Sequence, residues 1–80
     1  MKRLAEAVDT LVVIGSRTSA NTKRLLHLGR TVNPKTYLVE RVSARLKKLI
    51  RSSRTVGVIS GASAPQWLVN EIVAALKNNN

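Results

Sequence analysis

The chain has 80 residues and a formal net charge of +10, from 14 lysines and arginines against four acidic residues. This length allows one domain, and because there is no cysteine, the chain can form no disulfide and hold no cysteine-ligated metal or cluster. With one Trp and one Tyr, it lacks the stacking surface of single-strand nucleic-acid binders.

No apolar run reaches the roughly 20 residues that span a bilayer, and Glu6 and Asp9 interrupt the N-terminal stretch too early for a signal peptide. We expect a cytoplasmic protein with no membrane partner.

The first half of the chain predicts a short helix, a buried strand and a long helix. Residues 2–8 place their apolar side chains on one helical face. Residues 11–14 show no alternation of apolar and polar side chains, which is typical of a strand covered on both faces. A polar loop over residues 15–21 leads into a helix that runs to about Arg30, with Ser19 or Asn21 as its N-cap. The helical spacing of this segment depends on Leu25, Leu26 and Leu28.

The second half repeats the alternation of strand and helix. After an Asn33-Pro34 turn, residues 36–40 predict a strand, residues 43–52 a helix, residues 55–60 a strand and residues 65–77 a last helix. The expected buried stripe of the last helix consists of Leu68, Ile72, Val73 and Leu76, and that of the helix before it of Val42, Leu46, Leu49 and Ile50. We expect residues 1–77 to form one α/β domain and residues 78–80 to be a disordered tail.

Alternating strands and helices predict a parallel sheet with right-handed crossovers. Three strands in the order 2-1-3 place the wholly apolar first strand at the centre. The predicted fold is therefore a helix followed by βαβαβα, with helices on both faces of the sheet. This order creates a topological switch point between the first and third strands, so the loops that leave these strands meet at one crevice.

Both loops have the composition of an anion site. The first reads Gly15-Ser16-Arg17-Thr18-Ser19-Ala20-Asn21 and the second Ser60-Gly61-Ala62-Ser63-Ala64-Pro65. A strand, a tight polar turn and a helix present backbone N–H groups to a phosphate. The alternative interpretation is that both are ordinary turns in which Ser or Asn caps the following helix. The presence of two such loops favours a site.

A longer pattern runs through these loops: Gly15-Ser16-x-x-Ser19-x-Asn21-Thr22-x-Arg24-Leu25, Tyr37-Leu38-Val39-Glu40 and Val56-Gly57-Val58-x-x-Gly61-Ala62-Ser63-Ala64-Pro65. This pattern resembles the LytB/IspH family, the 4-hydroxy-3-methylbut-2-enyl diphosphate reductases of the non-mevalonate isoprenoid route. The resemblance covers nearly the whole chain but only the C-terminal one of the family's three α/β lobes. The Gly-Ala-Ser-Ala-Pro stretch, with Leu68-Val69-x-Glu71 after it, is its most specific part.

The resemblance implies that side chains on these loops hold the substrate diphosphate. Ser19, Asn21 and Ser63 match the family's binding positions, while Ala20 stands where the family commonly has Ser and Thr18 replaces a frequent Asn. Additional candidates in the same loops are Ser16, Arg17, Gly61 and Ala62. Of these, we interpret Arg17 as a residue that does not bind the diphosphate.

The other lobes of the family carry the cysteines of an iron–sulfur cluster, a catalytic Glu and several substrate-binding His. None of these segments is present, and we interpret the one histidine, His27, as a residue on the surface of a helix. We therefore expect no catalytic residue, no metal site and no cofactor in this chain, and no reductase activity from it alone.

The positive charge is densest between residues 41 and 54. It indicates either a solvated helix face or a footprint for nucleic acid or another polyanion. The residues of that candidate face are Arg41, Arg45, Lys47, Lys48, Arg51 and Arg54.

Three hypotheses follow. The chain is a diphosphate-binding lobe, isolated or engineered, that works with the missing lobes of the reductase. Alternatively, it is a stand-alone basic module that binds nucleic acid non-specifically or an acidic partner, or a structural or designed domain with no activity. The three matched polar residues favour the first and the charge favours the second.

Overall fold

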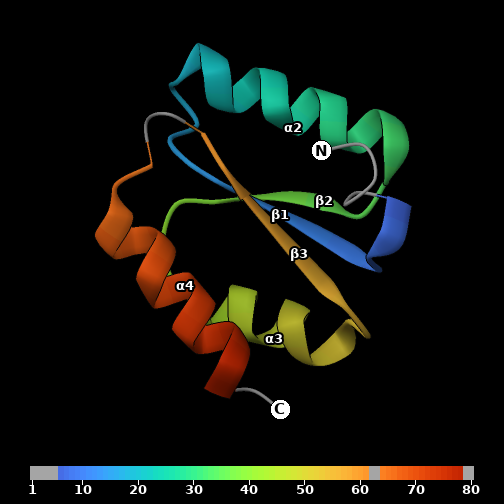
Figure 1. The fold of residues 1–80 in the computed structure, drawn as a ribbon, viewed down its shortest axis with the longest axis vertical. Coiled ribbons are helices and arrows are strands. Elements are labelled where there is room, and N and C mark those ends of the chain that lie inside the picture. Colours follow the sequence, from blue (N-terminus) through green and yellow to red (C-terminus); the bar gives the residue numbers. More distant parts are fainter. Residues whose placement is uncertain (1–5, 62–63, 79–80) are drawn as a thin grey trace.

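The computed structural model describes residues 6–61 and 64–78 (Figure 1). The main elements, in chain order, are β1 (Thr10–Ile14), α2 (Ala20–Val32), β2 (Thr36–Val39), α3 (Ala44–Ser52), β3 (Val56–Ser60) and α4 (Gln66–Asn78). Residues 6 and 7 are helical, and the rest of the expected first helix lies outside the described residues. The last helix ends one residue later than expected, at Asn78, and the rest of the expected tail is not described.

The three strands form a parallel sheet in the order β2-β1-β3, which confirms the predicted topology. β1 is central because every one of its residues is buried, as its unbroken apolar sequence requires. In the register, Ile14 lies opposite Val39 on one side and Ser60 on the other. The ends of all three strands therefore lie at one edge of the sheet.

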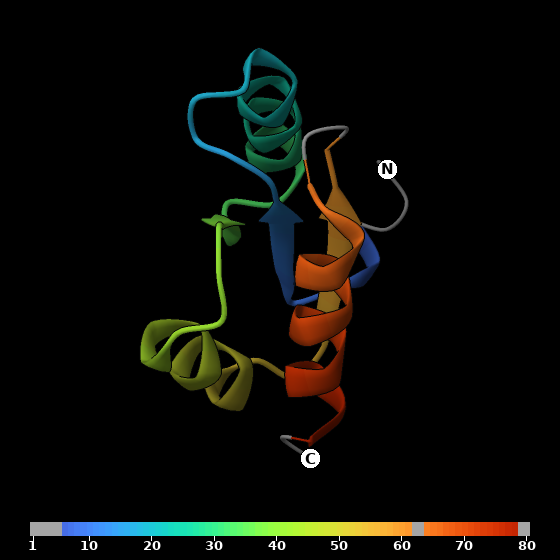
Figure 2. The same cartoon turned by 90° about the vertical axis from the view of Figure 1, so that its left-hand side faces the viewer.

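Helices cover both faces of the sheet, as predicted. α2 lies on one face, and α3 and α4 lie together on the other (Figures 1 and 2). Successive residues of a strand point to opposite faces, so β1 contributes to two packing layers. Val12 and Ile14 join a core cluster with buried side chains of β2, α3 and α4, which are Val39, Leu46, Ile50, Leu68 and Ile72.

The rotation of each helix decides which of its side chains are buried. Leu28 is 44% exposed, because α2 turns Thr22 and Gly29 toward the sheet. In α4, Val69 packs against the core cluster together with Leu68 and Ile72, in place of the expected Val73. No helix within the described ranges combines the length and apolar character that crossing a membrane requires.

Asp9 forms contacts that connect the starts of the three strands. Its carboxylate accepts a hydrogen bond from the backbone N–H of Arg54, before β3, at 3.2 Å. It also lies 3.4 Å from the ammonium of Lys35, before β2. Its own N–H donates to the hydroxyl of Thr55 at 2.8 Å. One side chain thus connects the segments that enter β1, β2 and β3.

This arrangement predicts a pH dependence of stability. The Arg54 N–H, and after it the Lys35 ammonium, lower the pKa of Asp9 below its ordinary value. A carboxyl whose pKa is lower in the folded state stabilises the fold above its unfolded pKa of about 4 and loses that contribution as the pH falls further. Asp9→Asn should therefore unfold more easily than the parent at pH 7, with the difference shrinking below about pH 4. Urea unfolding at both pH values tests this, and a difference that does not change with pH would contradict it.

Candidate functional site

The loops after β1 and β3 meet at the edge where these strands end. The N–H of Gly61, directly after β3, donates to the carbonyl of Ile14, the last residue of β1, at 3.0 Å. This bond extends the sheet by one step and holds the start of the second loop beside the first. The structure thus brings together the two segments that the sequence singled out.

Thr22, in the first turn of α2, packs against both loops. It is fully buried. A methyl group added at Gly15 would overlap its side chain, with 2.9 Å to Cγ2, and one added at Gly61 would lie 3.0 Å from its Oγ1. Neither glycine has a positive φ. These positions therefore need glycine for space, because the first turn of α2 lies directly against the loops.

Ser19 and Asn21 take different roles at the start of α2. The Ser19 side chain accepts a hydrogen bond from the Thr22 N–H at 3.4 Å, so Ser19 is the N-cap and Asn21 is not. Asn21 is exposed. Its side-chain nitrogen would lie 3.4 Å from a methyl group added at Gly61. The Asn21 amide therefore faces the second loop.

Ser16 and Arg17 form other contacts. The Ser16 hydroxyl shares a 2.7 Å hydrogen bond with that of Thr18. The Arg17 N–H donates to the Glu40 carboxylate at 3.4 Å, and the guanidinium lies 3.7 Å from it. Glu40 directly follows β2, so Arg17 turns toward β2 and not toward the loop after β3. Of the remaining candidates, Gly61 lies at the junction described above, whereas Ala62 and Ser63 lie outside the described residues.

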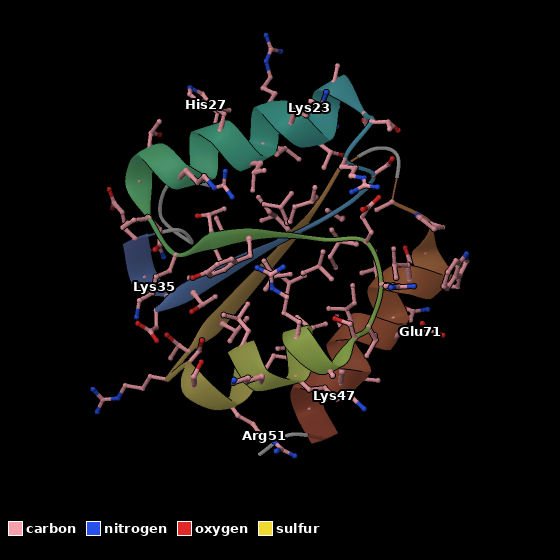
Figure 3. The ribbon with its side chains drawn as sticks, turned by 180° about the vertical axis from the view of Figure 1, so that it is seen from behind. Lys23, His27, Lys35, Lys47, Arg51 and Glu71 are labelled. Carbon is pink, nitrogen blue, oxygen red and sulfur yellow. The ribbon has the colours of Figure 1, made fainter. Side chains whose placement is uncertain are left out.

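The candidate polyanion face is divided by the structure. Arg41, Arg45 and Lys48 line a groove between β2 and α3, together with Arg30 from α2. Lys47 and Arg51 lie on the side of α3 away from β2 (Figure 3). Arg54 precedes β3 and contributes its backbone N–H to Asp9. The six basic residues therefore do not form one surface.

Other groups capable of chemistry are few. His27 lies on the outer, exposed side of α2 (Figure 3). Across the part of the chain that the structure describes, no three His, Asp or Glu side chains lie close enough to hold a metal ion. The site consists of backbone N–H groups, hydroxyls and one amide, which can bind an anion through hydrogen bonds.

Sequence reasoning missed two residues of this site. Thr22 was part of the family pattern, but nothing in the sequence indicated that it is buried against Gly15 and Gly61. The pairing of Glu40 with Arg17 had no local signal either, because the two residues are 23 positions apart.

A sequence model of one protein family, described as LytB protein, matches residues 1–77. Among individual proteins, the chain is similar to 4-hydroxy-3-methylbut-2-enyl diphosphate reductases. It is 32% identical to that of Aquifex aeolicus over 77 residues, 96% of this chain and 27% of the relative. It is 43% identical to that of Geobacter sp. strain M21 over 72 residues, 90% of this chain and 25% of the relative. The match to the Wolbachia pipientis wMel protein is 39% over 79 residues, 99% of this chain and 26% of the relative.

Among solved structures, the chain is similar to one of (E)-4-hydroxy-3-methyl-but-2-enyl diphosphate reductase, the terminal enzyme of the non-mevalonate pathway. The TM-score is 0.86 at 32% identity, covering 96% of this chain and 27% of the solved one. The chain thus spans about a quarter of the length of the relatives it matches.

The contact of Thr22 with Gly15 can be tested by a double-mutant cycle. We expect Gly15→Ala to cost about 1–3 kcal/mol of unfolding free energy, because the new methyl group overlaps the Thr22 side chain. In a Thr22→Ala background the same change should cost less, with a coupling energy of about 1 kcal/mol or more. Urea unfolding of the four proteins measures this. An equal cost in both backgrounds would show that α2 does not lie against the first loop as described.

Proposed function

The chain belongs to the LytB protein family, and from that premise we propose that it is a lobe that binds a diphosphate group between the loops after β1 and β3. The observation that carries the proposal is the convergence of both loops on the first turn of α2, through the Gly61–Ile14 hydrogen bond and the packing of Thr22. We further propose that this lobe alone does not catalyse the reaction of the relatives.

The start of α2 supplies backbone donors. The first N–H groups of any helix lack acceptors within the helix. Here Ser19 satisfies those of Thr22 and Lys23, through its hydroxyl and its carbonyl respectively. The N–H groups of Ala20 and Asn21 have no such partner in the described segments. The helix dipole adds a partial positive charge at the same place, which supports the binding of a phosphate oxygen there.

Neutral side chains complete the proposed site. The Ser19 hydroxyl accepts from the Thr22 N–H and still has its own proton to donate to an anion. The Asn21 amide can donate from the side of the second loop. Ser63 enters the proposal only through its match to the family pattern.

Arg17 remains a candidate ligand of the diphosphate, because its ion pair with Glu40 is weak. Its ion pair with Glu40 joins side chains that are 79% and 45% exposed. Such surface pairs contribute about 0–1 kcal/mol, so an anion in the first loop can draw Arg17 away at little cost. We nevertheless propose that the neutral donors define the site, since Arg17 points to β2 in this structure.

The cofactor that the family resemblance implies does not fit the residues present. An iron–sulfur cluster is held by cysteine thiolates, and this chain has no cysteine. We propose that reductase chemistry requires the segments that make up the other three-quarters of the relatives, which would also enclose the diphosphate.

Binding can be measured by titrating the isotope-labelled chain with inorganic diphosphate and following backbone amide shifts. We expect shifts at residues 15–21 and at Gly61, with an affinity no better than about millimolar because the site is open. Asn21→Ala should weaken binding, since it removes a donor without touching the helix cap.

A matched control is Ser43→Ala. Ser43 caps α3 as Ser19 caps α2, accepting from the Leu46 N–H at 3.2 Å. Its loss should cost about 1 kcal/mol of stability and leave the diphosphate shifts unchanged. Shifts confined to α3 around Lys47 and Lys48, with both loops silent, would overturn the proposal and favour a generic polyanion surface.

The proposed lack of catalysis has its own test. After incubation with iron, sulfide and a reductant, we expect no stoichiometric iron and no visible cluster absorbance on the purified chain, because there is no thiolate to bind a cluster. A cysteine-containing cluster protein treated in parallel shows that the reconstitution works. A stable cluster on this chain would contradict the proposal.

A further inference from the structure

A groove of about 620 Å³ runs along the outer side of β2, away from β1. Residues of α3 form its other wall. Its volume lies in the range of ligand sites, which is about 300–1,000 Å³. Apart from Glu40, its lining is cationic, apolar or hydroxyl-bearing, and it contains none of the residues of the proposed diphosphate site.

The strand that lines this groove has an open edge. The Lys35 carbonyl accepts a hydrogen bond from the Leu11 N–H of β1 at 2.9 Å, and the Val39 carbonyl accepts one from the N–H of Gly15, directly after β1, at 3.3 Å. Because backbone groups alternate in direction along a parallel strand, those of Thr36 and Leu38 point away from β1. The Thr36 carbonyl accepts from the Arg30 side chain at 3.2 Å. The N–H and the carbonyl of Leu38 have no partner in the described part of the chain.

The groove has an apolar wall. Val39 is part of the core cluster on the α3 side of the sheet. Tyr37, two residues earlier in the strand, therefore points to the same side, where it is 37% exposed. Leu46 and Leu49 of α3 face them across the groove. A side chain that enters between β2 and α3 would thus contact apolar groups.

The rim of the groove is positive. The exposed cations Arg41, Arg45 and Lys48 line it, and Arg30 lies at its other end. The one carboxylate among its lining residues belongs to Glu40, which is paired with Arg17 outside the groove. The charges of the groove therefore favour an acidic ligand.

We propose that this β2–α3 groove binds an acidic segment of another polypeptide in extended conformation. The segment adds a strand to the edge of β2, exchanging backbone hydrogen bonds with Leu38, and its carboxylates meet the cations of the rim. Leu38 offers one donor and one acceptor side by side, which matches a peptide backbone. A nucleic-acid phosphate offers only acceptors, so it cannot satisfy both groups. This proposal does not depend on the proposed diphosphate function.

The probe is a short blocked peptide in which glutamate alternates with valine, with a fluorescent label. Titration of the full chain with this peptide should shift the Leu38 amide signal and slow its hydrogen exchange, since that N–H becomes hydrogen-bonded. Anisotropy of the label measures the affinity. An absence of binding, or binding without protection of Leu38, would overturn the proposal.

Two neighbouring lysines provide a matched pair of variants. Lys48 lines the groove, whereas Lys47 lies on the side of α3 away from β2 (Figure 3). Both are exposed, and both changes replace a positive charge by a negative one. Lys48→Glu should weaken peptide binding about tenfold and Lys47→Glu less than about twofold, because only the first charge faces the peptide. Equal effects would mean general charge attraction and would overturn the proposed site.

A second comparison tests the backbone pairing. Methylating alternate backbone nitrogens of the peptide on one edge removes its donors and keeps every charge. One of the two methylated patterns should lose nearly all binding, because it removes the N–H that faces the Leu38 carbonyl. Unchanged affinity for both patterns, or equal affinity for an oligonucleotide of the same charge, would show a polyanion site and not strand addition.

Discussion

The burial of β1 on both faces is the constraint on which the rest of the structure depends. All five residues of this strand are buried, so helices must cover both faces and a strand must lie on each side. The Thr10 hydroxyl, buried at the start of the strand, is satisfied by that of Ser53 at 2.7 Å. With β1 central, the chain must leave it in one direction to form β2 and return past it to form β3. That return places the end of β3 beside the end of β1, and it leaves β2 at an open edge.

The meeting of the β1 and β3 ends creates one candidate site, and the open edge of β2 creates the other. At the ends of β1 and β3, the adjoining loops need room for the first turn of α2, and the glycines at positions 15 and 61 provide it where Thr22 packs. The result is a set of neutral donors around a helix N-terminus. Along β2, in contrast, the edge itself supplies the hydrogen-bonding groups, and α3 supplies apolar side chains and charge. The neutral donors at the start of α2 suit a small anion, and the open edge of β2 suits an extended polypeptide.

The sequence was sufficient to predict features that depend on local pattern and on topology. The unbroken apolar run of β1 predicted its central place, and the order of strands predicted that the two loops would meet. Features that depend on how far a helix is rotated, or on how closely it docks, could not be predicted. Lys47 and Lys48 are equivalent in the sequence, yet the rotation of α3 places only Lys48 in the groove. Likewise, the exposure of Leu28 and the choice of Val69 over Val73 depend on the exact position of each helix on the sheet.

Glu40 lies between the two candidate sites and affects both. It follows β2, lines the groove, and pairs with Arg17 of the first loop. In the first loop, this pairing offsets the one cation of residues 15–21, so the proposed diphosphate site depends on uncharged donors, which bind an anion less strongly than charged ones. In the groove, the same pairing offsets the one carboxylate of the lining, so the rim stays attractive to acidic ligands. Because both side chains of the pair are exposed, the pairing is weak, so an anion bound at the proposed diphosphate site would compete with Glu40 for Arg17. The charge at each proposed site would then depend partly on whether the other is occupied.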